Sequence, residues 1–542
     1  AVRIRALSVD QILDRLGDRF ALLTGGGLGA LPRHQTLRTT IEWSHDLLGP
    51  ADRTILRRLS VFAGRFTLDD VEGVCTSDEV PPPDALNLLI SLVDKSLVVK
   101  EGTEGDAWYR LHETMREFSA LKSSEAGEAA ATELRCVEYY RSRCRRSARE
   151  ARYGLLQWLA WMDIEIDNVR EVLRRCLVNG DAARGTELTC SLGWYWMTRA
   201  TSEGARWLDE FLAVGGDSME DRAPAHFMRG FLAVLQANAM IARRQLEEAV
   251  AGARQTGPAQ LLSQALSLLA VARDMSGDLE SAREALGEAV SIADGLDDLP
   301  AAVACLQAQA LDAFFRGDLA AVRTAAAEGA RRSREAGDLY SLEMMLLNLG
   351  LEALTAREAS RAWPFLTEGL QIAHRIDDRV AQFMFLSGLG CRASAAGEHP
   401  VAARLLGAAE TMRASAGAGV NGILGPLVIE AKAATEAAIG TVRFEAEIRA
   451  GGALSRAVAA SLALGESLDI AAAQLTETGA DLLGKREADV ARLVAGGLSN
   501  KQIGAQLFIS DRTVESHVRS ILNKLGFNSR AQIAGWLALT SR

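Results

Sequence analysis

A polar stripe near the C-terminal end of the sequence carries side chains that could bind a nucleic acid. Between residues 511 and 525, hydrophilic residues recur every three or four positions, which places them on one side of an α-helix. They are Arg512, Glu515, Ser516, Arg519 and Asn523. A guanidinium can donate two hydrogen bonds to guanine, and a carboxylate can accept one from cytosine. At 1.5 Å per residue the stripe spans about 16 Å, a length that suits the major groove of DNA.

A second, apolar stripe on the same segment predicts how the helix is held. Five aliphatic residues recur with helical spacing and predict a face that is buried in a core. They are Val514, Val518, Ile521, Leu522 and Leu525. Shorter helices are expected at 485–495 and 500–507, because Gly496-Gly497 ends the first and Ser499 can cap the second. With a fourth helix from Ser529, this order predicts a helix-turn-helix.

Local charge favours the same interpretation. From residue 482 onward nine Lys and Arg residues stand against four Asp and Glu residues, a net charge of about +5, although the whole chain carries −10. The acidic total argues against a protein that coats nucleic acid along its whole length. A basic module on an acidic body still attracts phosphate locally.

The segment resembles the LuxR-type helix-turn-helix domain. The resemblance rests on Lys485-Arg486-Glu487, residues 497–503 and 507–510, Thr513-Val514, His517-Val518, Ile521 and Lys524-Leu525. In that family the middle of the third helix lies in the major groove of double-stranded DNA. The resemblance therefore implies that Glu515, Ser516 and Arg519 face base edges.

The same resemblance implies contacts that position the domain without reading sequence. The residues that would anchor phosphates are Lys501, Thr513, His517, Lys524 and Arg530. The fourth helix usually joins two copies, here near Gln532 and Trp536, so a homodimer is expected.

The middle of the chain repeats with a period of 40 residues. Short polar turns separate Ala- and Leu-rich segments at Gly277-Asp278, Gly317-Asp318, Arg357-Glu358 and Gly397-Glu398. Paired helices at a fixed period are typical of a solenoid, and this pattern resembles tetratricopeptide repeats (TPRs). Weaker copies are expected around Glu203-Gly204 and Arg243-Arg244. The array could bind a protein or a small ligand, or it could act only as a spacer.

The first 124 residues predict a winged helix. Helices are expected at 36–48, 50–61, 68–75 and 84–95, followed by strands at 96–100 and 107–111 and a helix from Glu113. Residues 5–8, 18–20, 31–37 and 43–48 resemble the end of the nucleotide-binding region and the winged helix of signal-transduction (STAND/NB-ARC-like) ATPases with LuxR-type outputs.

Within this resemblance, Leu111-His112-Glu113 corresponds to a Met-His-Asp motif, which implies that His112 senses a nucleotide. However, the sequence contains no G-x-x-x-x-G-K-[ST] phosphate cradle. We therefore expect no ATPase activity and no cofactor in this chain, whereas a longer parent protein could bind ATP or ADP. The chain starts inside an expected helix and without Met, which suggests a fragment.

The remaining composition predicts a cytoplasmic protein. Seven scattered cysteines show no Cys-x-x-Cys pair, so neither a disulfide framework nor a zinc site follows. No apolar stretch approaches the roughly 20 residues of a membrane span, and no membrane partner is expected.

Together these patterns predict a mostly α-helical chain of four parts. They are a winged-helix-like domain at 1–124, TPR-like repeats at 125–411, an Ala/Gly-rich helical connection at 412–475 and the helix-turn-helix at 476–542. The hypothesis is a transcriptional regulator in which the repeats control the DNA-binding domain. The alternatives are an ATP-dependent signalling switch and a repeat scaffold that binds only proteins.

Overall fold

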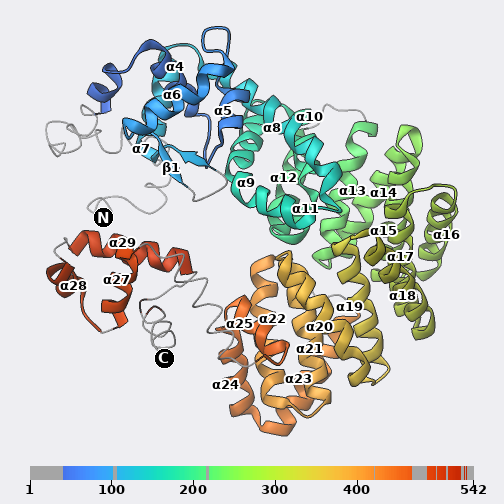
Figure 1. Cartoon of the computed structure of the whole chain (residues 1–542). Coiled ribbons are helices and arrows are strands. Elements are labelled where there is room, and N and C mark those ends of the chain that lie inside the picture. Colours follow the sequence, from blue (N-terminus) through green and yellow to red (C-terminus); the bar gives the residue numbers. More distant parts are fainter. Residues whose placement is uncertain are drawn as a thin grey trace. The chain divides into compact units, whose positions relative to one another are not determined.

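The structure is a computed structural model that is almost entirely helical, as predicted (Figure 1). It describes residues 41–101, 107–214, 219–419, 422–466, 485–495, 497–507 and 511–525, together with Arg530 and Ile533. The chain divides into two compact units. The first comprises residues 1–150, 157–192 and 210–216, and the second comprises 151–156, 193–209 and 217–542.

The predicted winged helix is confirmed in the first unit. Its elements are α4 (Pro50–Leu59), α5 (Leu68–Val74), α6 (Pro82–Asp94), β1 (Val99–Glu101), β2 (Trp108–Arg110) and α7 (Glu113–Glu125). The strands pair antiparallel, with Val99 opposite Arg110, and Phe66 bridges to Tyr109 on the other side of β2. The helices enclose a core that includes Leu56, Leu89 and Phe118. Of the helix expected at 36–48, residues 41–46 are helical, and 36–40 lie outside the described residues.

A buried polar network joins the winged helix to the helices that follow it. These helices are α8 (Ala129–Ala151), α9 (Leu155–Val178) and α10 (Ala182–Ser191). Asp70 of α5 accepts a hydrogen bond from the Tyr139 hydroxyl at 2.8 Å and pairs with Arg143, whose guanidinium also lies 3.3 Å from Glu165. The Tyr140 hydroxyl donates to Glu165 at 3.0 Å. Burial raises the pKa of Glu165 to about 7. Because the charges are paired across three helices, loss of one partner would leave another buried and unpaired.

The second unit contains the helical-repeat array, in which consecutive helices pack against one another (Figure 1). Two helices lead into it, α11 (Gly193–Thr198) and α12 (Thr201–Val214), the latter crossing the boundary between the units. The next helices are α13 (Met219–Leu235), α14 (Ala239–Thr256), α15 (Ala259–Met275), α16 (Leu279–Asp294), α17 (Leu299–Arg316), α18 (Leu319–Ala336), α19 (Leu339–Thr355), α20 (Ala359–Arg375), α21 (Arg379–Ala395) and α22 (His399–Ala416). Three more follow: α23 (Leu424–Ile439), α24 (Thr441–Gly452) and α25 (Arg456–Ala463).

The 40-residue period corresponds to one helix pair, and each pair turns through a residue in the left-handed region. These residues are Ala237, Gly277, Gly317, Arg357 and Gly397, with φ of 54°, 79°, 75°, 64° and 78°. The next residue is Asn, Asp or Glu, and Asn238 and Asp318 cap the second helix through their side chains. The weaker copies were misplaced, because Glu203-Gly204 lies within α12 and Arg243-Arg244 within α14. The first of these periodic turns is at Ala237 instead.

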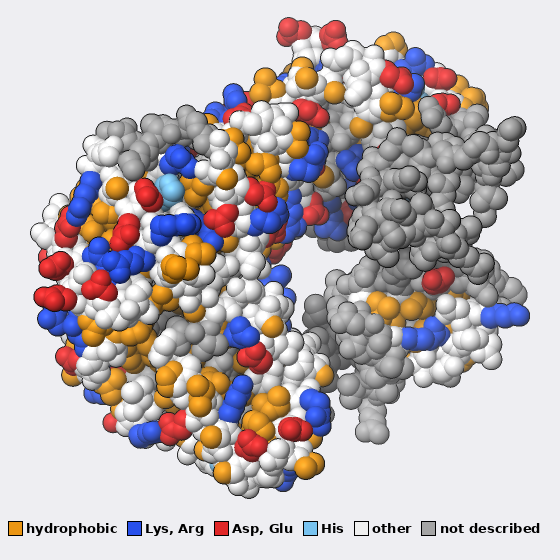
Figure 2. All heavy atoms as spheres, turned by 180° about the vertical axis from the view of Figure 1, so that it is seen from behind, with side chains coloured by type: hydrophobic (Ala, Val, Ile, Leu, Met, Phe, Trp, Pro, Cys, Tyr) orange, Lys and Arg blue, Asp and Glu red, His pale blue; other side chains and the backbone are white. Residues whose placement is uncertain are grey.

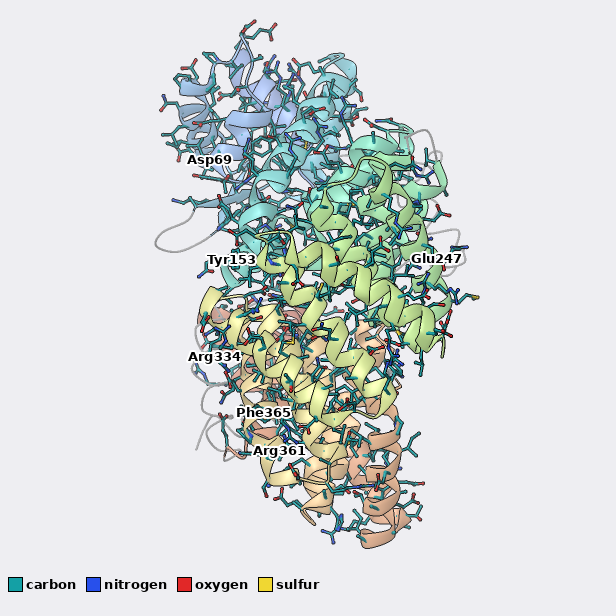
Figure 3. The ribbon with its side chains drawn as sticks, turned by 90° about the vertical axis from the view of Figure 1, so that its right-hand side faces the viewer. Asp69, Tyr153, Glu247, Arg334, Arg361 and Phe365 are labelled. Atoms are coloured by element: carbon teal, nitrogen blue, oxygen red, sulfur yellow. The ribbon has the colours of Figure 1, made fainter. Side chains whose placement is uncertain are left out.

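Close packing within the array depends on glycines that face large side chains of the next helix. A Cβ atom at any of five glycines would overlap the residue sixteen positions later. The pairs are Gly230 and Leu246, Gly329 and Met345, Gly350 and Leu366, Gly369 and Phe385, and Gly390 and Leu406. Other contacts between neighbours are polar. Arg361, labelled on α20 in Figure 3, pairs at 2.6 Å with the fully buried Glu352 of α19, while Phe365, one turn further, packs on the core.

A set of contacts that we call the clasp joins the start of the second unit to the turns before α19 and α21. Arg152 pairs with Asp338 at 2.6 Å and lies over the Trp194 ring. Arg199 donates to the carbonyl oxygens of Ile376, at 2.6 Å, and of Asp377. Arg152 and Asp338 are 186 residues apart in the sequence. These contacts therefore join segments of the second unit that lie far apart in the sequence.

Two acidic side chains are buried beside the clasp. Asp378 caps α21 by accepting from the Ala381 backbone N–H at 2.8 Å, and its pKa is raised by burial to about 7. Glu343 of α19 is fully buried, and its pKa lies well above the ordinary value because of burial and because Asp378 is close. Among the described residues no N–H or hydroxyl donor reaches the Glu343 carboxylate. A protonated Glu343 that donates to Asp378 satisfies both groups.

In the part of the chain that the structure describes, every helix is too short or too polar to cross a lipid bilayer.

We expect Glu343→Gln to change the pH dependence of stability. In the wild-type protein the folded pair retains a proton that an unfolded chain releases above about pH 4 to 5, because burial holds the pKa of Glu343 well above its ordinary value. The free energy of unfolding therefore falls as the pH rises above that range. A Gln amide donates to Asp378 without titrating. The thermal midpoint of the variant, relative to wild type, should therefore rise by about 1 to 2 °C between pH 5 and pH 8, the shift that about 1 kcal/mol produces in a unit of this size. Glu284→Gln, at an exposed position on α16, is the control. If the difference in thermal midpoint between Glu343→Gln and wild type were the same at pH 5 and pH 8, the shared proton would be contradicted.

Candidate nucleic-acid interface

Three C-terminal helices form a separate small core. They are α27 (Lys485–Ala495), α28 (Asn500–Leu507) and α29 (Asp511–Leu525), and the described bounds match those expected from the sequence. Their buried residues include Val490, Val494, Ile503, Val514 and Ile521. Ile533, in the region of the expected fourth helix, is buried in the same core. Since each helix has an apolar and a polar side, packing the apolar sides together turns the polar sides outward.

The turn between α27 and α28 is built from the residues that the sequence suggested. Gly497 adopts φ of 78°, which a residue with a side chain rarely adopts, and the Leu498 N–H returns to the Leu493 carbonyl at 3.3 Å. Ser499 caps α28, and Gln502 accepts from the Ser499 N–H at 2.8 Å and from its hydroxyl at 2.9 Å. Gln502 was not predicted as the capping partner of Ser499, although Ser-x-x-Gln is the spacing of a capping box.

Three of the five residues in the predicted apolar stripe of α29 are buried, Leu522 is partly buried, and the Leu525 side chain lies outside the described part of the structure. Val514 and Ile521 are fully buried and Val518 nearly so, whereas Glu515 and Thr513 are exposed. Helical register places positions 512, 516, 519 and 523 on the side opposite these three aliphatic residues. The side chains of Arg512, Ser516, Arg519, Asn523 and Lys524 lie outside the described part of the structure, so their predicted contacts remain predictions.

The other predicted phosphate anchors differ in their surroundings. Lys501 is exposed on the first turn of α28, and His517 is half-buried on α29. Arg530 is half-buried and bonded within the domain: its Nη1 donates to Asn500 Oδ1 at 2.6 Å and its Nη2 donates to the Leu498 carbonyl. The structure therefore gives Arg530 neighbours that the sequence did not suggest.

Two polar contacts between helices could not be found from sequence spacing. The buried Glu487 of α27 accepts from the Ser520 hydroxyl of α29 at 2.7 Å. Arg486 Nη2 donates to the carbonyl of Leu507, the last residue of α28, at 2.9 Å. Both link segments 21 to 33 residues apart, and they orient α29 and α28 on α27.

The predicted nucleotide sensor lies far along the chain from this domain, in the winged helix. His112 is exposed and is the N-cap residue of α7, separated from β2 by Leu111, and its carbonyl accepts from the Arg116 N–H at 2.9 Å. Its role as a sensor stays a prediction.

An amphipathic helix on a two-helix support, with a basic module around it, defines a DNA-binding protein of the helix-turn-helix class. Residues 481–537 match the family model described as bacterial regulatory proteins of the luxR family, and residues 48–122 match that of a winged helix-turn-helix domain. The chain therefore carries a LuxR-family DNA-binding domain at its C-terminal end and a winged helix near its N-terminal end, with a helical-repeat region between them.

Known proteins share parts of this arrangement. A proposed HTH-type transcriptional regulator of Mycobacterium tuberculosis is 31% identical over 389 residues, which are 69% of this chain and 43% of that protein. The nitrate/nitrite response regulator protein NarL of Escherichia coli is 38% identical over 92 residues, 16% of this chain and 43% of NarL. A solved STAND protein with a tetratricopeptide repeat sensor from Pyrococcus horikoshii is 15% identical, with a TM-score of 0.44, over 92% of this chain and 66% of that one. The chain spans less than half the length of these two curated relatives.

We expect Ser520→Ala to destabilise the C-terminal domain. The Glu487 carboxylate would lose one hydrogen-bond donor at a partly buried position, where such a bond typically contributes about 0.5 to 1.5 kcal/mol. Urea unfolding followed by a probe within residues 485–533 measures the loss. Lys501→Ala, at an exposed position, should change stability by less than about 0.5 kcal/mol. A Ser520→Ala domain as stable as the Lys501→Ala domain would show that the bond contributes nothing.

Proposed function

We propose that this protein is a bacterial transcriptional regulator that binds double-stranded DNA by inserting α29 into the major groove. The observation that carries the proposal is the burial of Val514, Val518 and Ile521, because it leaves the opposite side of α29 for the groove. The net charge of about +5 in this module supports attraction to phosphates. The match to the LuxR family supports it independently.

Within this proposal the polar residues of α29 have two roles. Glu515, Ser516 and Arg519 read base edges, and Arg512 and Asn523 extend the same stripe. Lys501, Thr513, His517 and Lys524 contact phosphates and set the orientation of the domain. Arg519 is the residue with the largest expected effect on sequence preference, because a guanidinium can bind a guanine with two hydrogen bonds.

The regulator acts as a dimer in this proposal, with two domains on two half-sites of one operator. The contact between copies lies near Gln532 and Trp536, residues outside the described part of the structure. The resemblance to LuxR-type domains supports this arrangement.

The repeat array is the sensing part in this proposal, and a protein or small ligand binds its surface. Lys, Arg, Asp and Glu are interspersed over the visible face of the array, without a broad patch of one sign (Figure 2). Such a surface favours a specific partner over a general polyanion. We further propose that the chain works in the cytoplasm and regulates without hydrolysing a nucleotide, since its sequence has no phosphate cradle.

Replacing Arg519 and Lys524 should separate base reading from phosphate binding. A duplex enriched from a random-sequence library by the wild-type protein serves as the specific DNA, and a scrambled duplex serves as the competitor. Arg519→Ala should lower the ratio of specific to scrambled affinity by about 5- to 150-fold, whereas Lys524→Ala should weaken both duplexes alike. Equal effects of the two changes on both duplexes would refute these roles.

Removing the repeats tests the regulatory part of the proposal. The test compares the full chain with residues 476–542 alone. It measures the oligomeric state by size-exclusion chromatography and the affinity for the enriched duplex. Release from control by the array should change at least one of the two quantities. Unchanged affinity and oligomeric state would exclude control by the array under these conditions and leave DNA binding itself intact.

A further inference from the structure

Arg530 makes contacts that do not fit the phosphate anchor implied by the family resemblance. Its guanidinium is half-buried, with Nη1 donating to Asn500 Oδ1 at 2.6 Å and Nη2 donating to the Leu498 carbonyl. A guanidinium is a rigid planar fork, so two hydrogen bonds to neighbouring acceptors fix its orientation. The fork is therefore directed at the protein.

The acceptors belong to the segment that sets the direction of α28. Leu498 follows the left-handed Gly497 and packs against the small C-terminal core, and Asn500 is the first residue of α28. The exposed Lys501 comes directly after Asn500. A residue that holds Asn500 therefore also determines where Lys501 can place its ammonium group.

The other end of α28 is held in a similar way. Arg486 of α27 donates to the carbonyl of Leu507, where α28 ends. Such a bond satisfies a carbonyl that has no partner within its own helix. Each end of α28 is thus tied by an arginine that is distant in sequence.

We propose that Arg530 is a positioning residue: it holds the start of α28, and with it Lys501, in the orientation that DNA binding requires, and it does not itself bind a phosphate. This inference rests on the proposed DNA binding. A phosphate anchor and a positioning residue both strengthen binding, but only the anchor displaces a counterion when the complex forms.

The experiment measures the affinity of the full chain for a random-sequence DNA duplex at several salt concentrations. Losing one phosphate contact reduces the slope of log K against log salt by about 0.9. We expect Arg530→Ala and Arg530→Lys to weaken binding by about tenfold each with the slope unchanged, because a lysine keeps the charge but cannot span both acceptors. Asn500→Ala should also weaken binding at constant slope, and adding it to Arg530→Ala should cost less than the sum of the single effects.

Lys501→Ala is the matched control, since it should reduce the slope by about 0.9. Thermal unfolding of every variant shows whether it is folded at the temperature at which its DNA affinity is measured. Arg530→Lys and Asn500→Ala keep the test decisive should Arg530→Ala fail to fold. The proposal is overturned if Arg530→Ala lowers the slope as Lys501→Ala does while Arg530→Lys binds like wild type, or if folded Arg530 variants bind unchanged. Absence of salt-dependent binding by the wild-type chain would instead refute the proposed function itself.

Discussion

The packing of one helix side in the C-terminal domain is the constraint on which the functional interpretation depends. Val514, Val518 and Ile521 pack on α27 and α28, and an α-helix that buries one side must expose the other. The hydrogen bond from Ser520 to the buried Glu487 fixes the rotation of α29 in this contact, since apolar packing alone tolerates small rotations that a hydrogen bond does not. Because α29 buries its apolar side, its polar stripe faces away from the core of the domain.

In the repeat array each helix likewise buries one side against its neighbours, and the turns within the helix pairs share one construction. A residue in the left-handed region ends one helix, and the following acidic or amide residue begins the next, as at Gly317 and Asp318. Glycines allow large side chains of the next helix to approach closely. The clasp adds contacts between distant parts of the second unit, so this array is more than a stack in which each repeat contacts only its neighbours.

Buried ionisable groups connect parts of the chain that lie far apart in the sequence. Their contacts are more selective than apolar packing alone. Asp70, Arg143 and Glu165 connect the winged helix with α8 and α9 in the first unit. Glu343 and Asp378 lie beside the clasp in the second unit, where a proton shared by the two carboxyl groups would satisfy Glu343, which has no other donor in the described part of the chain. Such pairs contribute little net stability compared with apolar residues, but they strongly penalise any arrangement that separates them.

Local sequence was sufficient to determine the helices at 485–495, 500–507 and 511–525, the winged helix and the 40-residue period, because caps, glycine turns and apolar spacing act within a few residues. It also supplied the polar stripe of α29. Only the tertiary structure decided that Arg530 binds Leu498 and Asn500, that Ser520 meets Glu487, and that Glu343 lies beside Asp378. These partners are tens of residues apart, and the periodicity of a single helix carries no information about which distant helix will face it.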